Sequence, residues 1–580
     1  MSTLLLVTIL LPAIGAVVVC LLADQGASGA RQTALVTSLL TLVLATVLAA
    51  NFDPPADPAA PFAGSAMEWL GPSSHINVEF SLGLDGLSIW MFALSALLLL
   101  TCVLVSWEAI TDRPAVFYSL LLLLGSGMLG VFAARDLILF YIFFEFTLIP
   151  LFFLIGVWGS EDRRYAAVKF FLFTLAGSLI TFLGLLTIVL WNYNHSDAGQ
   201  MTFSIHELTA GLTAHPLAQP YQLWVFLALF AGFAIKVPLF PLHTWLPLAH
   251  TQAPTAGSVL LAGVLLKIGT YGFARFSIPM LPEATAMCIP WILALSAAGI
   301  IYGALVALVQ TDMKRLIAYS SVSHLGFVML GLFALTSLGV EGGVLQMVNH
   351  GLSTGGLFAV VGMIYERYHT REIAQFGGIA RRTPILAFFF LLFTFSSIGL
   401  PGMNGFVGEF MILAGMFQRA WTEAPEGFEL LYKVIAVASV SGVVLGAWYM
   451  LYLVQRVFFG PLREPVVHGH DDHAHAAHVD HGHDDHGHGA VDTIPPSSIR
   501  DLSFREIMAV APLVVFIFWI GLHPEFFLSR MQATLEPMTR NAQAAVERMY
   551  GDPAAIAGGA NQEQVERVSL LAEGVPARDE

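Results

Sequence analysis

The sequence predicts an all-α polytopic membrane protein with about fourteen transmembrane helices. Hydrophobic residues make up 56% of its 580 residues, charged residues only 12%, and the mean hydropathy is +0.73. Soluble domains carry about 25% charged residues, so no large soluble domain fits this composition. Two apolar runs are interrupted by proline and glycine, and they lie five spans apart. This arrangement predicts two broken helices within two inverted five-helix repeats.

The spans follow from apolar runs about 19 residues long, the length that crosses a bilayer as a helix. The first run lacks a basic leader and a small-residue cleavage site, so we expect it to be a retained helix. The fourteen predicted spans lie near 2–22, 31–50, 84–107, 114–132, 135–157, 165–191, 222–247, 255–277, 285–308, 314–336, 342–365, 385–415, 430–459 and 505–528.

These spans divide the chain into five parts. We expect helices 1–3 in 1–110, the first repeat (helices 4–8) in 114–277 and the second repeat (helices 9–13) in 285–459. A cytoplasmic loop rich in histidine and aspartate follows in 460–504, and the last helix with an external tail fills 505–580. We expect the tail 529–580 to pack on the outer face or on a neighbouring subunit, with no long lateral helix.

The distribution of basic residues predicts the orientation. Loops after odd-numbered spans hold fifteen lysine and arginine residues, whereas loops after even-numbered spans hold four. Basic residues accumulate on the cytoplasmic side of a membrane protein. We therefore expect both termini on the outer side.

Composition and motifs exclude several functions for this chain. The net charge of −15 argues against nucleic-acid binding. The three cysteines show no CxxC spacing, so neither a disulfide framework nor an iron–sulfur cluster is indicated. No Walker loop and no convincing dinucleotide fingerprint is present. Any redox or nucleotide chemistry therefore belongs to another chain, and we assign no cofactor and no metal here.

Two lysines lie inside predicted spans, where a charge costs about 2.5 to 3.5 kcal/mol. Lys236 precedes the break at Pro238 and Pro241, and Lys267 lies in the next span. Glu145 has no basic neighbour in its own helix, so it is either a carboxyl kept neutral by burial or the partner of Lys236. A lysine and carboxylate pair whose separation changes loads and releases a proton.

Histidines supply the next candidates, because imidazole titrates near neutral pH. His324 and His350 lie in apolar spans that also contain serine, threonine, asparagine and glycine. They serve either as proton carriers or as hydrogen-bonded structure. His243 and His250 flank the inner end of the broken seventh span, where they connect it to the cytoplasm or simply lie at the interface.

Glu409 follows the second interrupted helix, in which Gly399, Pro401 and Gly402 disrupt the regular hydrogen bonds. Irregular backbone at membrane depth survives only beside protein or water. Each of the two broken spans thus places an ionisable residue near its break. That is the pattern of an inverted-repeat transporter, although a proline kink alone explains either break taken singly.

Four segments together resemble the antiporter-like subunits of respiratory complex I, the related multisubunit cation/proton antiporters and the membrane-bound hydrogenases. The likeness extends from about residue 80 to 460. Glu409 resembles the glutamate of the subunit M and mitochondrial chain 4 branch, where subunits L and N have lysine. The four segments are FYIFFEFTLIPLFFLIGVWG, GFAIKVPLFPLHTWLPLAHTQAPTAGSVLLAGVLLKIGTYG, DMKRLIAYSSVSHLGFV and IGLPGMNGFVGEF.

The resemblance implies a chain of proton-transfer residues, with an ion pair of Glu145 and Lys236, a relay at Lys267, His324 and His350, and a terminal site at Glu409. It also implies proton translocation driven by quinone reduction in partner subunits, which hold NADH, flavin, iron–sulfur clusters and quinone. The partners are neighbouring antiporter-like subunits, the lipid bilayer and protons. The location implied is the bacterial inner membrane.

Three questions stay open at this point. Between 468 and 488 the chain packs nine histidines and five aspartates, which either bind zinc or nickel weakly or form an inert or proton-buffering loop. The chain alternatively belongs to a sodium/proton antiporter without a redox partner, or to a membrane-bound hydrogenase. It is also compatible with a structural scaffold whose buried charges only hold helices together.

Overall fold

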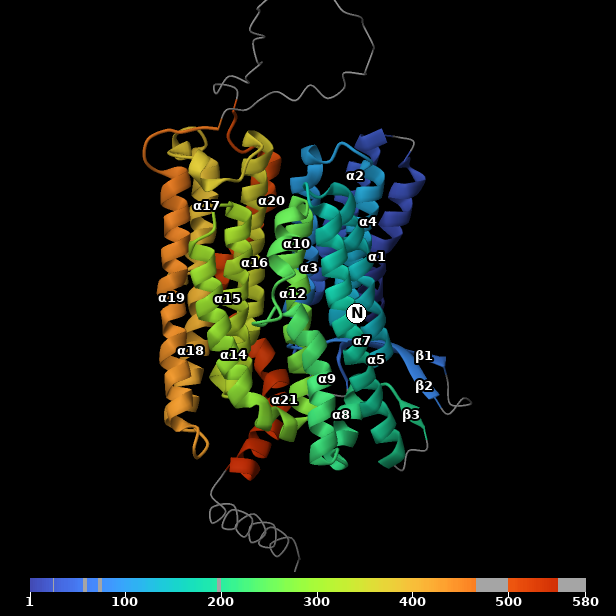
Figure 1. Ribbon diagram of the computed structural model, residues 1–580. Helices are drawn as coiled ribbons and strands as arrows, with labels where there is room; N and C mark the ends of the chain where they lie inside the picture. Colours follow the sequence, from blue (N-terminus) through green and yellow to red (C-terminus); the bar gives the residue numbers. More distant parts are fainter. Residues whose placement is uncertain (24–25, 56–59, 71–75, 196–199, 466–498, 551–580) are drawn as a thin grey trace, which may run out of the picture.

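The computed structural model describes residues 1–23, 26–55, 60–70, 76–195, 200–465 and 499–550. Helices run side by side in one bundle, with a small sheet at the lower end of Figure 1. The described parts of the loops that follow odd-numbered predicted spans gather at the upper end of Figure 1, which we call the inner end; we call the opposite end the outer end.

Three helices and a hairpin precede the first half of the bundle. The hairpin lies between the second and third helices, and a two-residue strand from far along the chain pairs parallel with it, in the order β1-β2-β3. The all-α prediction overlooked this sheet because nine-residue strands fall between the apolar runs. The elements are α1 (Ser2–Leu21), α2 (Gly26–Ala50), β1 (Phe62–Leu70), β2 (Ile76–Leu84), α3 (Ile89–Ala109) and β3 (Met201–Thr202).

The first half contains one broken helix and one run of mixed helical type. The break after Lys236 coincides with Pro238 and Pro241, whose nitrogens cannot donate to a helix. Two π turns interrupt the run that holds Lys267. The helices are α4 (Pro114–Ala133), α5 (Leu137–Phe146), α6 (Leu148–Trp158), α7 (Arg163–His195), α8 (Ile205–Ala214), α9 (Gln219–Lys236), α10 (Leu246–Gln252), α11 (Thr255–Leu260), η3 (Leu261–Leu265), α12 (Leu266–Gly272), η4 (Phe273–Ser277) and α13 (Ile278–Met280).

The second half contains the other broken helix. At that break Gly399 and Gly402 have φ of +70° and +91°, a conformation that glycine adopts without a steric penalty. The helices are α14 (Pro282–Leu308), α15 (Met313–Ala334), α16 (Ser337–Tyr368), η5 (Ile373–Gln375), η6 (Ile379–Arg381), α17 (Pro384–Ser397), α18 (Asn404–Trp421) and α19 (Glu429–Phe458).

The core of the bundle is the contact between the two halves. The apolar windows of α16 and of the run from α11 to α13 are fully buried, whereas those of α2 and α20 are only 33% buried. α16 packs on α15, α18, α11 and η3, so its polar residues face other helices of this chain. Polar side chains on α16 therefore lie inside the protein, away from the surface that would face lipid.

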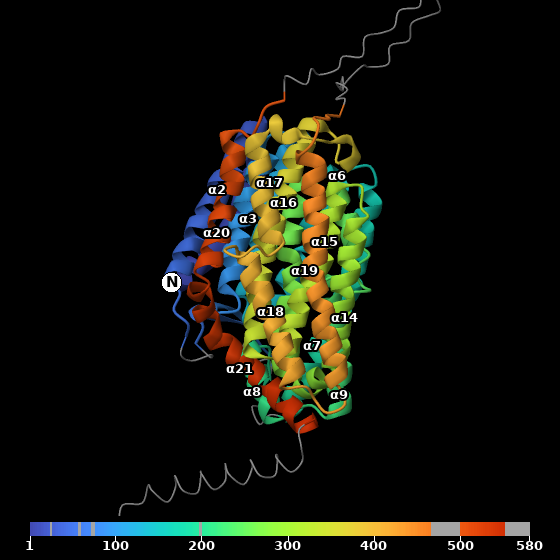
Figure 2. The ribbon, with the colours of Figure 1, turned by 90° about the vertical axis from the view of Figure 1, so that its left-hand side faces the viewer.

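The chain ends in two helices, α20 (Phe504–Leu522) and α21 (Glu525–Tyr550). α21 buries one face, which includes Phe527, Met531 and Leu535, and packs on α13, α14 and α16 at the outer end (Figures 1 and 2). The predicted tail therefore begins with a 26-residue helix that the sequence analysis did not anticipate, packed against other helices of this chain. That no long lateral helix follows the last span stays a prediction. In α21 the apolar residues are spaced three or four apart among charged residues, which is the pattern of an amphipathic helix.

Twelve helical segments of the described residues are long and apolar enough to cross a membrane. The seventh and twelfth predicted spans are missing from this set because the structure divides each into two shorter helices, α9 with α10 and α17 with α18. The total of fourteen crossings and the inverted repeats stay predictions. The histidine-rich segment 468–488 and the tail beyond 550 lie outside the described residues.

Candidate functional site

Lys236 is the last residue of α9, and its side chain is buried at 5% exposure. Its Nζ donates to the carbonyl of Phe144 at 3.4 Å and stands 3.4 Å from the centroid of the Phe144 ring. The partial negative charge at a helix C-terminus and the face of an aromatic ring both attract an ammonium. The broken helix thus creates a place for a cation inside the bundle.

Glu145 does not contact Lys236, and in this structure the predicted ion pair is open. Among the described residues no ion pair joins them, although the carboxyl is close enough to interact electrostatically with the ammonium. Oε1 of Glu145 is buried without a hydrogen-bond partner in the part of the chain that is described. The physical reason is that Phe144, the neighbour of Glu145 on α5, supplies both contacts to the ammonium.

Lys267 is fully buried and directly contacts His350. Its Nζ lies 2.6 Å from Nδ1 of His350 and also donates to the carbonyl of Ala262. Ala262 belongs to η3, one of the two π turns that flank Lys267, and π turns disturb the regular pairing of helix carbonyls. No local sequence pattern predicts these π turns. They supply an acceptor for the buried ammonium.

His350 leads on to His324 and then to Glu409. The two imidazole rings are in contact, with centroids 5.6 Å apart. Nδ1 of His324 lies 3.2 Å from Oε1 of Glu409, and both side chains are buried. The structure therefore brings together four of the six predicted site residues in one chain of contacts.

Polar side chains that the sequence prediction missed hold the Glu409 end in place. Gln346 donates to Oε1 of Glu409 at 3.2 Å, and Asn349 donates to Gln346 at 3.0 Å. Nε2 of His324 lies 3.2 Å from the hydroxyl of Ser397, at the end of α17. The break between α17 and α18 thus exposes polar groups to the site, as irregular backbone at depth requires.

His243 and His250 are buried within the protein at 3% and 0% exposure, so neither imidazole lies on the exposed surface of the bundle. The ring of His250 stacks on Phe358 at 4.6 Å, and neither ring nitrogen has a hydrogen-bond partner among the described residues. His250 lies within electrostatic range of Lys267 and of Lys314. No described contact joins Lys236 to Lys267. His250 is a titratable group that lies between the two halves of the bundle.

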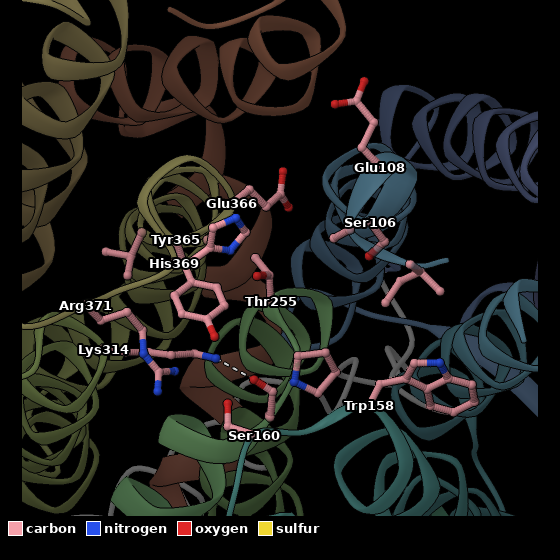
Figure 3. A pocket seen from close by; sticks show the side chains of 16 residues that line it. Ser106, Glu108, Trp158, Ser160, Thr255, Lys314, Tyr365, Glu366, His369 and Arg371 are labelled. Atoms are coloured by element: carbon pink, nitrogen blue, oxygen red, sulfur yellow. Dashed lines mark hydrogen bonds between the residues drawn. The ribbon is translucent and has the colours of Figure 1, made fainter. Parts of the chain in front are cut away.

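A cavity of about 420 Å³ opens at the inner end between the two halves (Figure 3). The buried Lys314 points into it and donates to the carbonyl of Ala253, which follows α10. Glu366 and Arg371 line the same cavity from the second half, and Trp158 lines it from the first. Lys314 was counted as a loop residue in the sequence, because only its contacts show that it is buried.

Two carboxyl groups at the outer end have shifted pKa values. Burial alone would raise the pKa of Asp85, but the guanidinium groups of Arg275 and Arg135, at 2.7 and 3.0 Å, hold it well below its ordinary value. Burial raises the pKa of Asp136 to about 6, although backbone N–H groups of Glu79 and of α5 partly offset this. The sequence prediction placed both residues at the ends of spans, but in the structure Asp85 precedes α3 and Asp136 precedes α5, so both lie outside the apolar helical segments. Asp136 anchors the sheet to the bundle, because it accepts hydrogen bonds from Glu79 of β2 and from Ile138 of α5.

The sequence analysis assigned no metal site to this chain, and that prediction can be examined only for the described residues. No group of three or more His, Cys, Asp or Glu residues with the spacing of a metal site occurs within the described ranges.

Comparison with known proteins defines the class of this protein. A family model described as NADH:quinone oxidoreductase/Mrp antiporter, TM, matches residues 134–424, a range that includes all six predicted site residues. Subunit M of the NADH-quinone oxidoreductase of Rhodobacter capsulatus is 39% identical over 497 residues, covering 85% of this chain and 87% of the relative. Chain 4 of the NADH-ubiquinone oxidoreductase of Arabidopsis thaliana is 38% identical over 479 residues, covering 82% and 86%.

Solved structures agree with this result. A chain of respiratory complex I from Thermus thermophilus with bound NADH superposes with a TM-score of 0.75 at 30% identity, covering 93% of this chain and 99% of that one. A chain of the Mrp complex from Dietzia sp. DQ12-45-1b shares the fold, with a TM-score of 0.70 at 21% identity over 94% and 100%. The chain therefore belongs to the NADH:quinone oxidoreductase/Mrp antiporter family of membrane subunits. Within that family it falls in the branch of subunit M and chain 4 of NADH-quinone oxidoreductase.

Proposed function

We propose that this chain moves protons across the membrane as an antiporter-like subunit of NADH-quinone oxidoreductase, driven by quinone reduction in partner subunits. The observation that carries the proposal is the buried chain of titratable groups from Lys267 through His350 and His324 to Glu409. Ionisable residues at membrane depth are costly, and they mark ion pathways. Family membership supplies the redox partner that this chain itself lacks.

Lys236 and Glu145 act as the switch of this chain of groups. With the pair open, the ammonium depends on the Phe144 ring and carbonyl, so its proton is held less firmly than beside a carboxylate. When Glu145 closes on Lys236, the charged form is favoured and a proton is retained. A change of a few kcal/mol is enough, since moving one charge through 100 mV involves about 2.3 kcal/mol.

Protons enter at the inner end and leave beyond Glu409. The cavity beside Lys314 opens there, and His250 lies within electrostatic range of both Lys314 and Lys267. Most of the basic residues predicted for the loops belong to this end, even without the buried Lys314, which supports a cytoplasmic location for it and an outer location for both termini. In this arrangement the redox cofactors, NADH, flavin, iron–sulfur clusters and quinone, all belong to partner subunits, and this chain contacts neighbouring antiporter-like subunits and lipid.

Replacement of Lys236 and Glu409 in the assembled complex tests the proposal. Lys236→Ala and Glu409→Ala complexes are reconstituted into liposomes, and NADH-driven proton uptake is measured beside quinone reduction. We expect each variant to lose proton uptake while its subunit content matches the wild type. Lys433→Ala is the matched control, because this lysine is half-buried near the ring of Trp421, away from the chain of groups.

Two other functions predict different results in the same liposomes. If the chain is a sodium/proton antiporter subunit, a sodium gradient should drive proton movement without NADH. The fold that this chain shares with the Mrp complex is the reason to test this alternative. A purely structural subunit gives wild-type proton uptake in both assembled variants. That last outcome would refute the proposed function.

A further inference from the structure

Helices α2, α20 and α3 lie close together on one side of the bundle (Figure 2). Residues near the outer ends of these helices line a narrow apolar groove of about 150 Å³. Both α2 and α20 pack on α3, and α16 forms the floor. The neighbouring surface is strongly apolar, because α2 and α20 turn large hydrophobic residues outward along their length. Side chains that line the groove include Leu42, Ala93, Leu97, Leu352, Phe516 and Trp519.

Trp90 gives the groove a hydrogen-bond donor. This residue lines the groove at 7% exposure, and its indole N–H is buried without an acceptor among the described residues. An indole N–H that is buried in a protein normally finds a partner. The rings of Phe526 and Phe527 pack against Trp90 at 5.8 and 4.7 Å, so the donor is held in a fixed aromatic wall.

Arg530 places a positive charge beside the same wall. Its guanidinium stacks on Phe526 at 4.0 Å and donates one hydrogen bond to the Phe526 carbonyl, while its Nε is buried without a described partner. The acid nearest in the chain, Glu525, is exposed, and Asp85 already pairs with two other arginines. Arg530 therefore keeps donors for an anion.

From the inside of the bundle outward, these groups follow the same order as the parts of a phospholipid: acyl chain, ester and phosphate. The apolar part of the groove reaches inward to Leu97 and Leu352, Trp90 is the second residue of α3 at its outer end, and Arg530 lies beyond the end of α20. Tryptophan and arginine prefer the interface and headgroup levels of a bilayer. The vertical order is thus hydrocarbon, hydrogen-bond donor and cation.

We propose that this groove binds one phospholipid of the outer leaflet. Part of one acyl chain fills the apolar groove, an ester carbonyl accepts the Trp90 N–H, and the phosphate pairs with Arg530. A membrane lipid fits better than a soluble ligand, because residues of α2 and α20 line the groove and the apolar windows of these two helices are only 33% buried. A lipid held there fixes α20 and α21 against α3.

Photo-crosslinking locates the lipid. The complete complex is reconstituted with a phosphatidylethanolamine that carries a diazirine near the end of one acyl chain, irradiated and digested, and the labelled peptides are identified by mass spectrometry. We expect label concentrated on the peptides of α2, α3 and α20 that line the groove. Label spread evenly over all lipid-facing helices, or a neighbouring subunit's peptide crosslinked in the groove, would overturn the proposal.

Variants separate the two ends of the lipid. Ala93→Phe fills the groove and should lower the label there at least tenfold. Arg530→Gln removes the charge and should lower it about fivefold, the effect of one basic residue at a membrane surface. Trp90→Phe keeps the ring but removes the donor, and should also lower the label.

The control is Val437→Phe, on the exposed face of α19 far from the groove, which should leave the label unchanged. Equal label in the control and in all three variants would also overturn the proposal. The proposal does not depend on proton translocation, because the label is measured without turnover.

Discussion

Replacing Lys267 with arginine tests the relay most sharply, because it keeps the charge and removes the ability to release a proton. Lys267 is fully buried and faces two acceptors, the Ala262 carbonyl and Nδ1 of His350 at 2.6 Å. Arginine satisfies the same acceptors as a cation. The broader guanidinium costs about 1 to 3 kcal/mol in a packed interior, which a large membrane complex tolerates.

The expected loss follows from the ordinary proton affinities of the two side chains. Lysine titrates near pH 10.4 and arginine at about 12.5 or higher, so the neutral form becomes at least about 100-fold scarcer in the same surroundings. A relay that must pass through its neutral form slows by that factor, equivalent to about 3 kcal/mol. Lys267→Met, which has no charge, should stop transfer as well.

The assay compares NADH-driven proton uptake in liposomes with quinone reduction in the presence of an uncoupler. The Lys267→Arg complex should assemble with all its subunits and lose at least about 90% of proton uptake, whereas Lys433→Arg should behave as the wild type. Wild-type proton uptake by an assembled Lys267→Arg complex would refute the reasoning, since a permanent cation cannot relay protons.

Three further predictions concern coupling, pH and packing. His324→Gln and Glu409→Gln should each slow proton uptake, and the double variant should be no slower than the worse single one, because both break the same 3.2 Å contact; additive losses would contradict this. Because the pKa of Asp136 is raised to about 6 in the folded protein, the stability that its protonated form contributes is fully present below about pH 4 and is lost as pH rises through about 6. Across that window the free energy of unfolding of the wild type should fall by up to about 3 kcal/mol relative to Asp136→Asn, and its melting temperature should fall with it. Melting temperatures that change in parallel for the two proteins would contradict this prediction. Gly232→Ala places a Cβ 2.7 Å from a backbone oxygen of α7 and should destabilise by about 1 to 3 kcal/mol. Gly156→Ala, whose Cβ meets its neighbour at 3.6 Å, should instead be neutral or stabilise by up to about 1 kcal/mol, as thermal unfolding of the purified protein will measure.

The sequence predicted the bundle well because its signals are local. Apolar runs of helical length, and prolines just after Lys236, depend only on neighbouring residues. The hairpin between α2 and α3 was missed because its strands are shorter than the window that detects spans. α21 was missed for a related reason, since its apolar face is spread over 26 residues among charges.

The sequence analysis predicted which residues form the site, but it predicted only some of the contacts between them. Charge in an apolar run identifies Lys267 and Glu409, but the sequence does not contain the distances that join them to His350 and His324. Nothing local distinguishes an open from a closed pair of Glu145 and Lys236, because the answer depends on how the ring of a neighbouring phenylalanine packs. The π turns beside Lys267 likewise result from packing between helices and not from local composition.

Infrared difference spectroscopy of the assembled complex during NADH turnover tests the central claim most directly. If Glu409 takes up and releases a proton, a carboxylic acid C=O band should appear during turnover, shift in heavy water and vanish in Glu409→Gln. The same band should be lost in Lys267→Arg, because protons no longer reach Glu409. An unchanged spectrum in Glu409→Gln, with proton uptake at the wild-type rate, would contradict a proton path that ends at this residue.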